Sequence, residues 1–310
     1  MKVRLPQNRK NVLQQPLCSE EDEEVTFMLD ESAVGLSVEQ DFSYTWRDLI
    51  LYNLSVGEEL EYVYEKGLKA VPTFGVIPCT ATFGTEPYSE QPLMPTKKIE
   101  GLRSDGTLHM DHKLVIHKPI SKEGKLHLEK VISAVYDRGE GKGAKINVDI
   151  IAKDEAGDPV FTNTMGYLNR WAGGFGGPKV PHSTVVIPER EADYEIKDAY
   201  PENAPLLYRL TGDTYPLHAD PAFAKKAGFD RPIVHGLCSL GYACRMMIDA
   251  LFPGEPQRMV SIENQFRAVA LPGDHFTLHV WKTGENEALF RMVKDSDGKA
   301  ILDYGRMTWK

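Results

Sequence analysis

The residues best suited to chemistry in this chain are Asp213 and His218, which lie five positions apart. Pro216 stands between them and favours a turn, so both side chains can reach the same side of a loop. A carboxyl group and an imidazole together can take a proton from water and deliver one to carbon. The pair therefore predicts acid–base chemistry, such as the addition of water to a polarised double bond or its removal.

Gly236 could supply the third part of such a site, because it opens a segment with helical periodicity. A glycine amide at a helix N-terminus presents its N–H to a ligand, and the helix dipole favours negative charge there. Hydration of an α,β-unsaturated thioester needs such a donor, since the thioester oxygen gains enolate charge. Taken singly, Asp213 could be a turn or cap residue, and His218 and His235 could be core histidines. Only the three-part order favours a site.

The composition bounds the class of protein. With 310 residues and 42% hydrophobic content, the chain can form one large domain or two medium ones. Its 36 basic and 45 acidic residues give a net charge of -9, which argues against nucleic acid or anionic membrane surfaces as partners. No apolar run is long enough to span a bilayer, and the basic start lacks the apolar core of a secretory signal.

The cysteines and the chain end bear on the compartment. No C-x-x-C pair occurs among the four cysteines, so they indicate reduced thiols in an intracellular protein: Cys18, Cys79, Cys238 and Cys244. We expect a cytoplasmic protein if the source is bacterial and a peroxisomal one if it is eukaryotic. The sequence ends in Met-Thr-Trp-Lys, which is not a Ser-Lys-Leu type address.

Hydrophobic periodicity predicts an α+β fold built from two similar halves. The second half reads as a short helix over 204–210, a long helix over 233–252, and strands at 258–270, 275–282, 287–294 and 299–309. The first half reads as a helix near 46–54, a bent apolar stretch at 71–78, and strands that include 114–117, 126–131 and 145–150. An antiparallel sheet wrapped around a long helix, present twice, fits this order.

The chain divides into four parts on composition. Residues 1–30 predict a polar tail with an acidic run at 19–24, residues 31–170 a first unit, and residues 184–310 a second unit. The glycine-rich stretch in 171–183 lacks the G-x-G-x-x-G spacing of a phosphate loop, and it predicts a flexible linker.

The order of residues around the pair closely resembles the hydratase motif of the MaoC-like family. The matching segments are 208–213, 216–221, 227–229 and 232–238. Further segments at 51–57, 72–78, 118–120 and 173–177 resemble the N-terminal half of the (R)-specific enoyl-CoA hydratase 2 unit of peroxisomal multifunctional enzyme type 2. The likeness extends over roughly residues 40–308 and is specific.

This resemblance implies a double hot dog fold and reversible hydration of trans-2-enoyl-CoA to (3R)-3-hydroxyacyl-CoA. It implies that the C-terminal unit holds the catalytic pair, while the N-terminal unit accommodates the acyl chain. No Gly-Asp followed by Pro-Leu-His occurs before residue 200, in agreement with this division. An acyl-CoA thioester would be the substrate, no separate cofactor would be needed, and a homodimer is expected.

Matched residue by residue, Asp213 and His218 correspond to the family's catalytic pair and Gly236 to its oxyanion donor. The resemblance implies these substrate-binding positions: His109, Met110, Arg138, Thr214, Tyr215 and Phe266. Three of them depart from the family pattern. Tyr215 replaces an asparagine, Met110 a glycine, and Arg138 a lysine, so the pocket and the phosphate contact can differ.

Two other readings stay open. The same chemistry could act on a branched, aromatic, steroidal or dicarboxylic acyl-CoA or on a carrier-protein thioester, since Tyr215 and Met110 alter the pocket. Alternatively, the protein could bind acyl-CoA after losing turnover through Tyr215. The sequence favours His218 as the base and Asp213 as the acid only narrowly over the reverse, because the two groups are coupled.

Other candidate sites are weaker. His109 and His112 form an H-x-x-H, but residues three apart on a regular strand point to opposite faces, so we expect no metal site. Cys238 and Cys244 have helical spacing and predict core positions rather than nucleophiles.

Overall fold

The computed structural model describes residues 29–57, 59–80, 93–103 and 106–310. The acidic run at 19–24 and Cys18 lie outside these residues. Leu29, at the end of the expected polar tail, is buried in the core, and the Asp30 side chain accepts a hydrogen bond from Ser32 N at the start of the first short helix. No helix in the described ranges is both long and apolar enough to cross a membrane.

Each half of the chain forms a unit of helices and five strands. The first unit contains η1 (Glu31–Ala33), β1 (Ser37–Tyr44), α1 (Trp46–Val56), α2 (Leu60–Val63), η2 (Pro72–Val76), α3 (Ile77–Thr80), η3 (Pro95–Lys98), β2 (Thr107–Ile116), β3 (Gly124–Asp137), β4 (Ala144–Lys153) and β5 (Pro159–Asn169). The second contains β6 (Tyr194–Ala199), α4 (Ala204–Tyr208), η4 (Arg209–Thr211), η5 (Pro216–His218), α5 (Pro221–Lys226), α6 (Gly236–Leu251), η6 (Pro256–Arg258), β7 (Met259–Phe266), β8 (His275–Gly284), β9 (Glu287–Lys294) and β10 (Ala300–Trp309).

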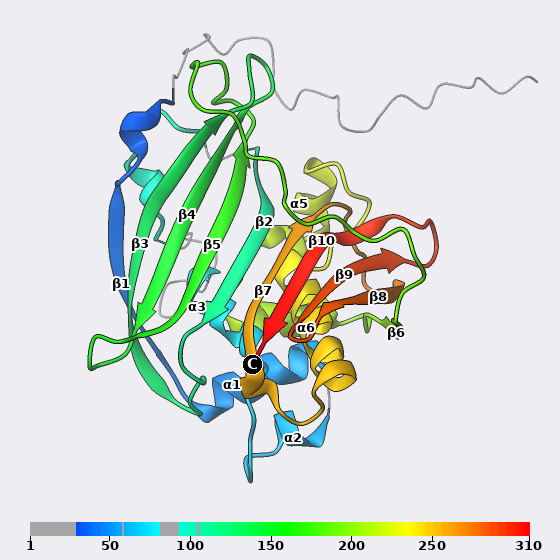
Figure 1. The fold of residues 1–310 in the computed structure, drawn as a ribbon. Coiled ribbons are helices and arrows are strands. Elements are labelled where there is room, and N and C mark those ends of the chain that lie inside the picture. The colour runs from blue at the N-terminus through cyan, green and yellow to red at the C-terminus, as the bar shows by residue number, and fades with distance from the viewer. Residues whose placement is uncertain (1–28, 58, 81–92, 104–105) are drawn as a thin grey trace, which may run out of the picture.

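The strands join into one ten-stranded antiparallel sheet in the order β1-β3-β4-β5-β2-β7-β10-β9-β8-β6. Counted from either edge, the two units contribute their strands in the same sequence, and β2 and β7 meet at the centre (Figure 1). In the register of this seam, His112 lies opposite Asn264 and Leu114 opposite Ile262. The predicted α+β fold of two similar units, the double hot dog arrangement, is confirmed.

Sequence periodicity missed the first strand of each unit, β1 and β6. Both lie at the edges of the sheet, where one side of the strand is unpaired. Most of their side chains are exposed or partly buried, and β1 buries only Phe42 and Tyr44, near its end. Edge strands carry charged residues, which oppose pairing with other chains. Such polar strands give little hydrophobic signal. In each unit an edge strand therefore precedes the first helix, and α1 corresponds by order to α4.

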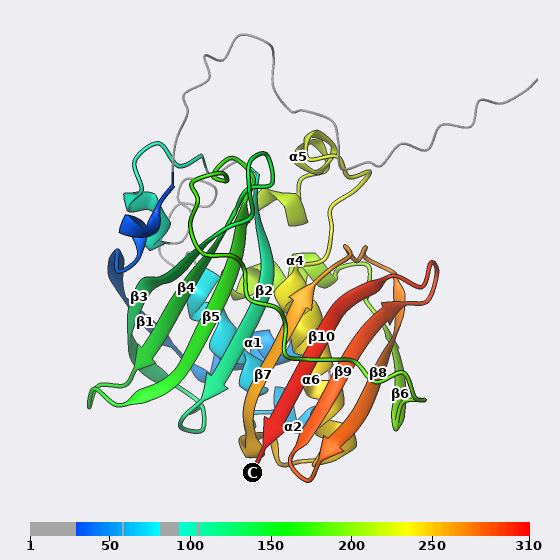
Figure 2. The same ribbon diagram turned by 45° about the horizontal axis from the view of Figure 1, so that its top comes forward.

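The long helix of the second unit lies against the face of the sheet that also carries α1 (Figure 2). Every residue from Leu237 to Ile248 is buried, so α6 is surrounded by protein on all sides. Its one charged member in that run, Arg245, forms ion pairs with Glu59 of the first unit and Asp198 of β6. These pairs compensate the buried guanidinium, and the pair with Glu59 connects the two units.

The helix predictions held with small shifts of boundary. The expected helix near 46–54 is α1, begun by a capping box between Thr45 and Asp48. The helix expected over 233–252 is Gly236–Leu251, and the one over 204–210 is α4 continued by η4. The bent stretch at 71–78 forms the short helices η2 and α3.

The glycine-rich stretch between the units is hydrogen-bonded to the first unit, contrary to the expected flexible linker. The buried Asp137 carboxylate at the end of β3 accepts from the backbone N–H of Gly174 at 2.9 Å, Gly139 at 2.7 Å and Gly176 at 2.8 Å. These bonds lower the pKa of Asp137. A single buried carboxylate, distant in sequence, can thus bind a glycine run for which composition alone indicates no partner.

Candidate active site

The predicted catalytic residues lie in the connection between α4 and α6, residues 209–235. The connection passes through η4, η5 and α5, which stand at the end of the sheet where β7 finishes and β2 begins (Figures 1 and 2). Pro216 starts η5, and His218 ends it. The backbone N–H of Tyr215 donates to the Asp213 carboxylate at 3.3 Å, which forms a tight local turn.

The His218 ring has a defined tautomer. Its Nδ1 lies 2.9 Å from the carbonyl oxygen of Ile233. A carbonyl oxygen can only accept, so Nδ1 must carry the proton in this hydrogen bond. In the neutral ring Nε2 then has the lone pair and is free to act as a base.

His235 supports both members of the pair. Its ring stacks on the His218 ring, with centroids 3.6 Å apart and planes 22° apart. Its Nε2 donates to the backbone carbonyl of Asp213 at 3.2 Å. The sequence pattern favoured a structural role for His235, and the geometry adds that this role is to hold the pair in place.

Burial dominates the electrostatics of the pair. Desolvation raises the pKa of Asp213, and the nearby His218 opposes the rise. Desolvation lowers the pKa of His218, and Asp213 opposes the fall. Both groups are therefore biased toward their neutral forms, while their mutual attraction favours the charged forms, so they titrate as a coupled pair.

Gly236 is the first residue of α6, a position whose N–H has no acceptor inside the helix. A Cβ at this position would lie 2.9 Å from Cδ1 of Phe266. The Phe266 ring therefore packs directly against this helix start. The structure thus brings together Phe266, predicted to bind the substrate, and Gly236, predicted to bind the thioester oxygen.

His109 joins the same region from the first unit. Its ring centroid lies 4.8 Å from that of Phe266, 5.2 Å from Tyr167 and 5.4 Å from His112. The expectation that His109 and His112 point to opposite faces was wrong. A β-bulge between His109 and Asp111 inserts one residue into β2, and that shifts the alternation of side chains. No group of three metal-ligating side chains occurs in the described part of the chain.

The remaining predicted substrate contacts are more dispersed. Met110 is the extra residue in the bulge of β2. Arg138 is exposed in the β3–β4 loop, at the same end of the sheet, and its Nη1 donates to Lys142 O at 3.2 Å. Thr214 O accepts from Arg209 Nη2 at 3.2 Å. Tyr215 is 42% exposed, with its ring 6.3 Å from His218 and 5.4 Å from Phe223.

Two tyrosines near the pair, the buried Tyr208 and the partly buried Tyr167, were not singled out from sequence. The Tyr208 ring lies 4.8 Å from His235, and its hydroxyl has no hydrogen-bond partner among the described residues. Burial raises the pKa of Tyr208 and of Tyr167, and the Asp213 charge raises both further. Tyr208 belongs to the motif segment 208–213, which was the one signal for it; Tyr167 on β5 had none.

The buried cysteines conform to the predicted core role. Cys79, Cys238 and Cys244 are free and buried. Burial raises the pKa of each thiol, to about 12 for Cys79 and Cys244. A thiol of this kind stays protonated near neutral pH and is a poor nucleophile.

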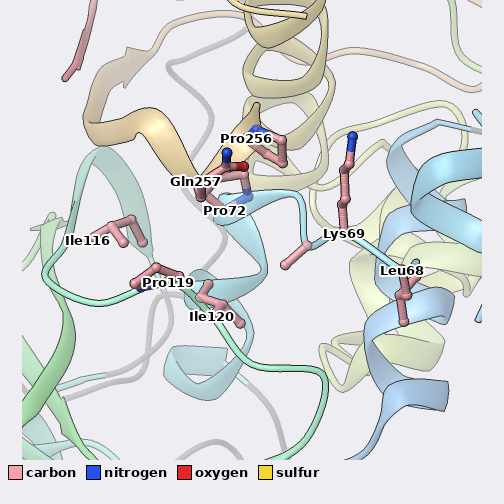
Figure 3. Close-up of a pocket in the computed structure, with 9 residues that line it drawn as sticks. Leu68, Lys69, Pro72, Ile116, Pro119, Ile120, Pro256 and Gln257 are labelled. Carbon is pink, nitrogen blue, oxygen red and sulfur yellow. The ribbon is translucent and has the colours of Figure 1, made fainter. Parts of the chain in front are cut away.

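A separate pocket of about 150 Å³ lies away from the pair (Figure 3). It is lined by Leu68, Lys69, Ala70, Pro72, Ile116, Pro119, Ile120, Pro256 and Gln257. Ile116 ends β2, whereas His109 stands near its beginning, so this edge of the pocket and His109 are separated by roughly 20 Å along the strand. Its lining contains no acid–base pair.

Comparison with known proteins divides the chain at the same linker, between the two units. A model described as MFE-2 hydratase 2 N-terminal domain matches residues 42–170, and one described as MaoC like domain matches residues 183–302. "Probable enoyl-CoA hydratase 2" of Dictyostelium discoideum is 33% identical, over 86% of this chain and 90% of that protein.

Two further comparisons agree. "Enoyl-CoA hydratase ChsH3" of Mycobacterium tuberculosis is 31% identical, over 84% of this chain and 92% of that protein. The crystal structure of a MaoC-like dehydratase from Phytophthora capsici superposes with a TM-score of 0.79 at 27% identity, and covers 91% of this chain and 99% of that one. With one unit matching each model and the likeness running through both, the chain belongs to the MaoC-like family, in its two-unit hydratase 2 branch.

Proposed function

We propose that this protein catalyses the reversible hydration of trans-2-enoyl-CoA to (3R)-3-hydroxyacyl-CoA in fatty acyl-CoA metabolism. One observation carries the proposal. The bond from His218 Nδ1 to Ile233 O leaves Nε2 as a base, beside the half-buried carboxyl group of Asp213, whose pKa is raised by desolvation. The relatives named enoyl-CoA hydratase support the substrate class.

In the proposed reaction, His218 Nε2 removes a proton from water as the water oxygen bonds to the β-carbon. The π electrons of the double bond move toward the thioester carbonyl, and the protonated Asp213 carboxyl delivers its proton to the α-carbon. The product gains one water, and a proton transfer from His218 to Asp213 restores the starting state. The raised pKa of Asp213 and the lowered pKa of His218 favour these initial forms.

Gly236 and the first unit take the remaining roles. The Gly236 N–H, at the start of a 16-residue helix, would donate to the thioester oxygen as it gains negative charge. The substrate would lie along Phe266 and His109, whose rings are 4.8 Å apart. Arg138, exposed on the β3–β4 loop, would contact the CoA phosphates.

The test is a panel of trans-2-enoyl-CoA esters of increasing chain length, with chiral analysis of the product. We expect hydration to the (3R) alcohol across part of the series. An (S) product, or no hydration of any ester, would contradict the proposal. Including branched, aromatic and dicarboxylic esters and a carrier-protein thioester separates the second reading, in which the chemistry is kept and the acyl group differs.

The proposed reaction involves no oxidation or reduction. It needs no group beyond the side chains of Asp213 and His218 and the Gly236 N–H. Enzyme dialysed against a chelator should therefore keep its full rate, measured against an undialysed sample. We also propose that the protein is a homodimer. Light scattering during size-exclusion chromatography would measure its molar mass and so test this. A monomer with full activity would remove the dimer from the proposal and leave the reaction intact.

A further inference from the structure

A buried polar cluster lies at the seam between the two units, beside the ring of His109. Its other members are His112 on β2, Asn163 on β5 and Asn264 on β7, each with no more than 3% of its surface exposed. His112 and Asn264 face each other in the register of the seam. The cluster therefore unites both halves of the chain close to Phe266 and the start of α6.

The orientation of one amide fixes the hydrogen-bonding capacity of the cluster. Asn163 Nδ2 donates to Gly75 O at 3.0 Å, so Asn163 Oδ1 faces His112. That oxygen lies 2.8 Å from His112 Nε2 and can only accept, which places the ring proton on Nε2. His112 Nδ1 is then an acceptor.

Four buried atoms of this cluster have no hydrogen-bond partner within the described residues. They are His112 Nδ1, His109 Nε2, and both Oδ1 and Nδ2 of Asn264. Leaving one such atom unpaired costs about 1–3 kcal/mol. These four atoms, on the adjoining strands β2 and β7, could therefore all bind to one polar group placed among them.

The cluster is uncharged, which restricts the class of ligand. Burial lowers the pKa of His112 to about 4, and that of His109 well below its ordinary value, so both rings are neutral near pH 7. The charged residues beside the cluster on β2 and β7 are already paired, Asp111 with Lys145 at 2.8 Å and Glu263 with Arg306 at 2.6 Å. A carboxylate or phosphate would find no counter-charge here, whereas a hydroxyl or keto oxygen would be satisfied.

We propose that His112 and Asn264 form a polar subsite for a neutral oxygen substituent, a hydroxyl or keto group, on the acyl chain of the substrate. Such a hydroxyl would donate to His112 Nδ1 and accept from Asn264 Nδ2. His109, which contacts both Phe266 and His112, joins the subsite to the reacting end. The inference rests on the proposed function, and it adds the class of acyl chain that the site prefers.

The experiment compares trans-2-enoyl-CoA esters of one length that differ only in a hydroxyl or keto group, moved one carbon at a time along the chain. We expect one positional isomer to exceed the unsubstituted ester in kcat/KM by about tenfold, the effect of one net hydrogen bond. Asn264→Leu removes the donor at similar volume and should abolish this preference, while hydration of the unsubstituted ester continues.

Asn147→Leu is the matched control. Asn147 on β4 also has an Oδ1 that finds no partner among the residues the structure describes. It stands outside the cluster, so the preference should persist in that variant. Wild-type enzyme that hydrates the plain ester and shows no positional preference would overturn the subsite and leave ordered water as the only occupant. Wild-type enzyme that hydrates no ester would overturn the proposed function instead.

Discussion

The two units share one strand order. They differ in the connection that follows the first α-helix of each unit and leads to α6 in the second unit and to η2 and α3 in the first. In the second unit this connection is residues 209–235, and it carries Asp213, His218 and His235. In the first unit the corresponding connection, between α1 and η2, runs from residue 57 to 71 and holds only the short α2. The proposed chemistry thus resides in a connection, and the repeated sheet supplies the frame that fixes its ends.

A second difference concerns one glycine in each unit, Gly236 at the start of α6 and Gly75 within η2, two residues before α3 begins. Gly236 packs against Phe266, whereas Gly75 in η2 faces Leu114 and Phe161, whose nearest atoms would lie 3.2 Å and 3.3 Å from a Cβ at this position. Gly75 O is already occupied by Asn163. Gly236 therefore lies beside Phe266 at the proposed reaction site, whereas Gly75 is enclosed by Leu114 and Phe161. If function separates along this line, substitutions in the two units should have different consequences.

The largest effect is expected from Asp213→Asn, which keeps the shape and removes the acid. We expect kcat to fall by about 10²–10⁴-fold, as for loss of a general acid. His218→Gln should cause a similar fall, and the double variant should lose little more, because the two act as a unit. Steady-state kinetics on a short enoyl-CoA measures all three.

Asp220→Asn is the control for this experiment. Asp220 lies in the same connection and caps α5 through Ala222 N at 2.8 Å. Asparagine caps helices as well as aspartate does, so activity should be retained. If Asp213→Asn kept wild-type turnover, our assignment of the pair would be wrong, and the acyl-CoA-binding reading would gain.

Gly236→Ala should lower kcat by about 10–100-fold. The new methyl group would stand 2.9–3.0 Å from the Phe266 ring and would shift either the ring or the helix start, and oxyanion donors tolerate little displacement. Gly75→Ala is the counterpart in the first unit. It should mainly lower stability, with kcat within about twofold of wild type in the folded protein. Equal losses of kcat in both variants would mean that Gly236 and Gly75 do not differ in their contribution to catalysis.

Local patterns predicted the elements of this fold wherever one face is strongly apolar. The long α6 and the strands of the second meander are examples. The two edge strands escaped because their residues are polar and mixed. The attachment of the glycine-rich stretch escaped because it depends on Asp137, a residue distant in the chain.

For the candidate site, sequence could name residues whose order is local. Asp213, His218 and Gly236 lie within one connection and the helix that follows it. The contribution of the first unit depends on the bulge in β2, which brings His109 and His112 to one face. Hydrophobic periodicity does not predict where a single residue is inserted into a strand as a bulge. The buried Asn264 likewise becomes notable only when the seam is assembled.

The first unit should also make the protein sensitive to acid. His112 has a folded pKa of about 4 against an ordinary 6.5, so the unfolded chain binds its proton more readily. Stability contributed by neutral His112 is therefore present above pH 6.5 and falls as pH drops toward 4. Between pH 7 and pH 5 this amounts to about 2 kcal/mol in the free energy of unfolding.

Denaturant titrations at the two pH values, on wild type and His112→Asn, measure this contribution as a difference. Wild type should lose about 2 kcal/mol more than the variant over that interval. Titration of the histidines outside this cluster is common to both proteins and cancels. An equal loss in both would show that His112 keeps its ordinary pKa and that the seam cluster can carry charge.

The smallest effect is expected at Tyr215, inside the connection itself. Its side chain is 42% exposed, and its ring lies closer to Phe223, at 5.4 Å, than to His218, at 6.3 Å. Tyr215→Asn restores the family's amide and should change kcat/KM for straight-chain esters by less than about fivefold. The ratio between branched and straight esters should shift more, because the ring borders the site.

Tyr215→Phe separates the hydroxyl from the ring in the same assay. If the ring alone shapes the pocket, Tyr215→Phe keeps the wild-type ratio of branched to straight esters and Tyr215→Asn does not. A gain in turnover of about 100-fold or more in Tyr215→Asn would reverse the comparison between the units. The second unit would then hold an intact acid–base pair blocked by its own connection, and this protein would be a binding relative of the hydratases.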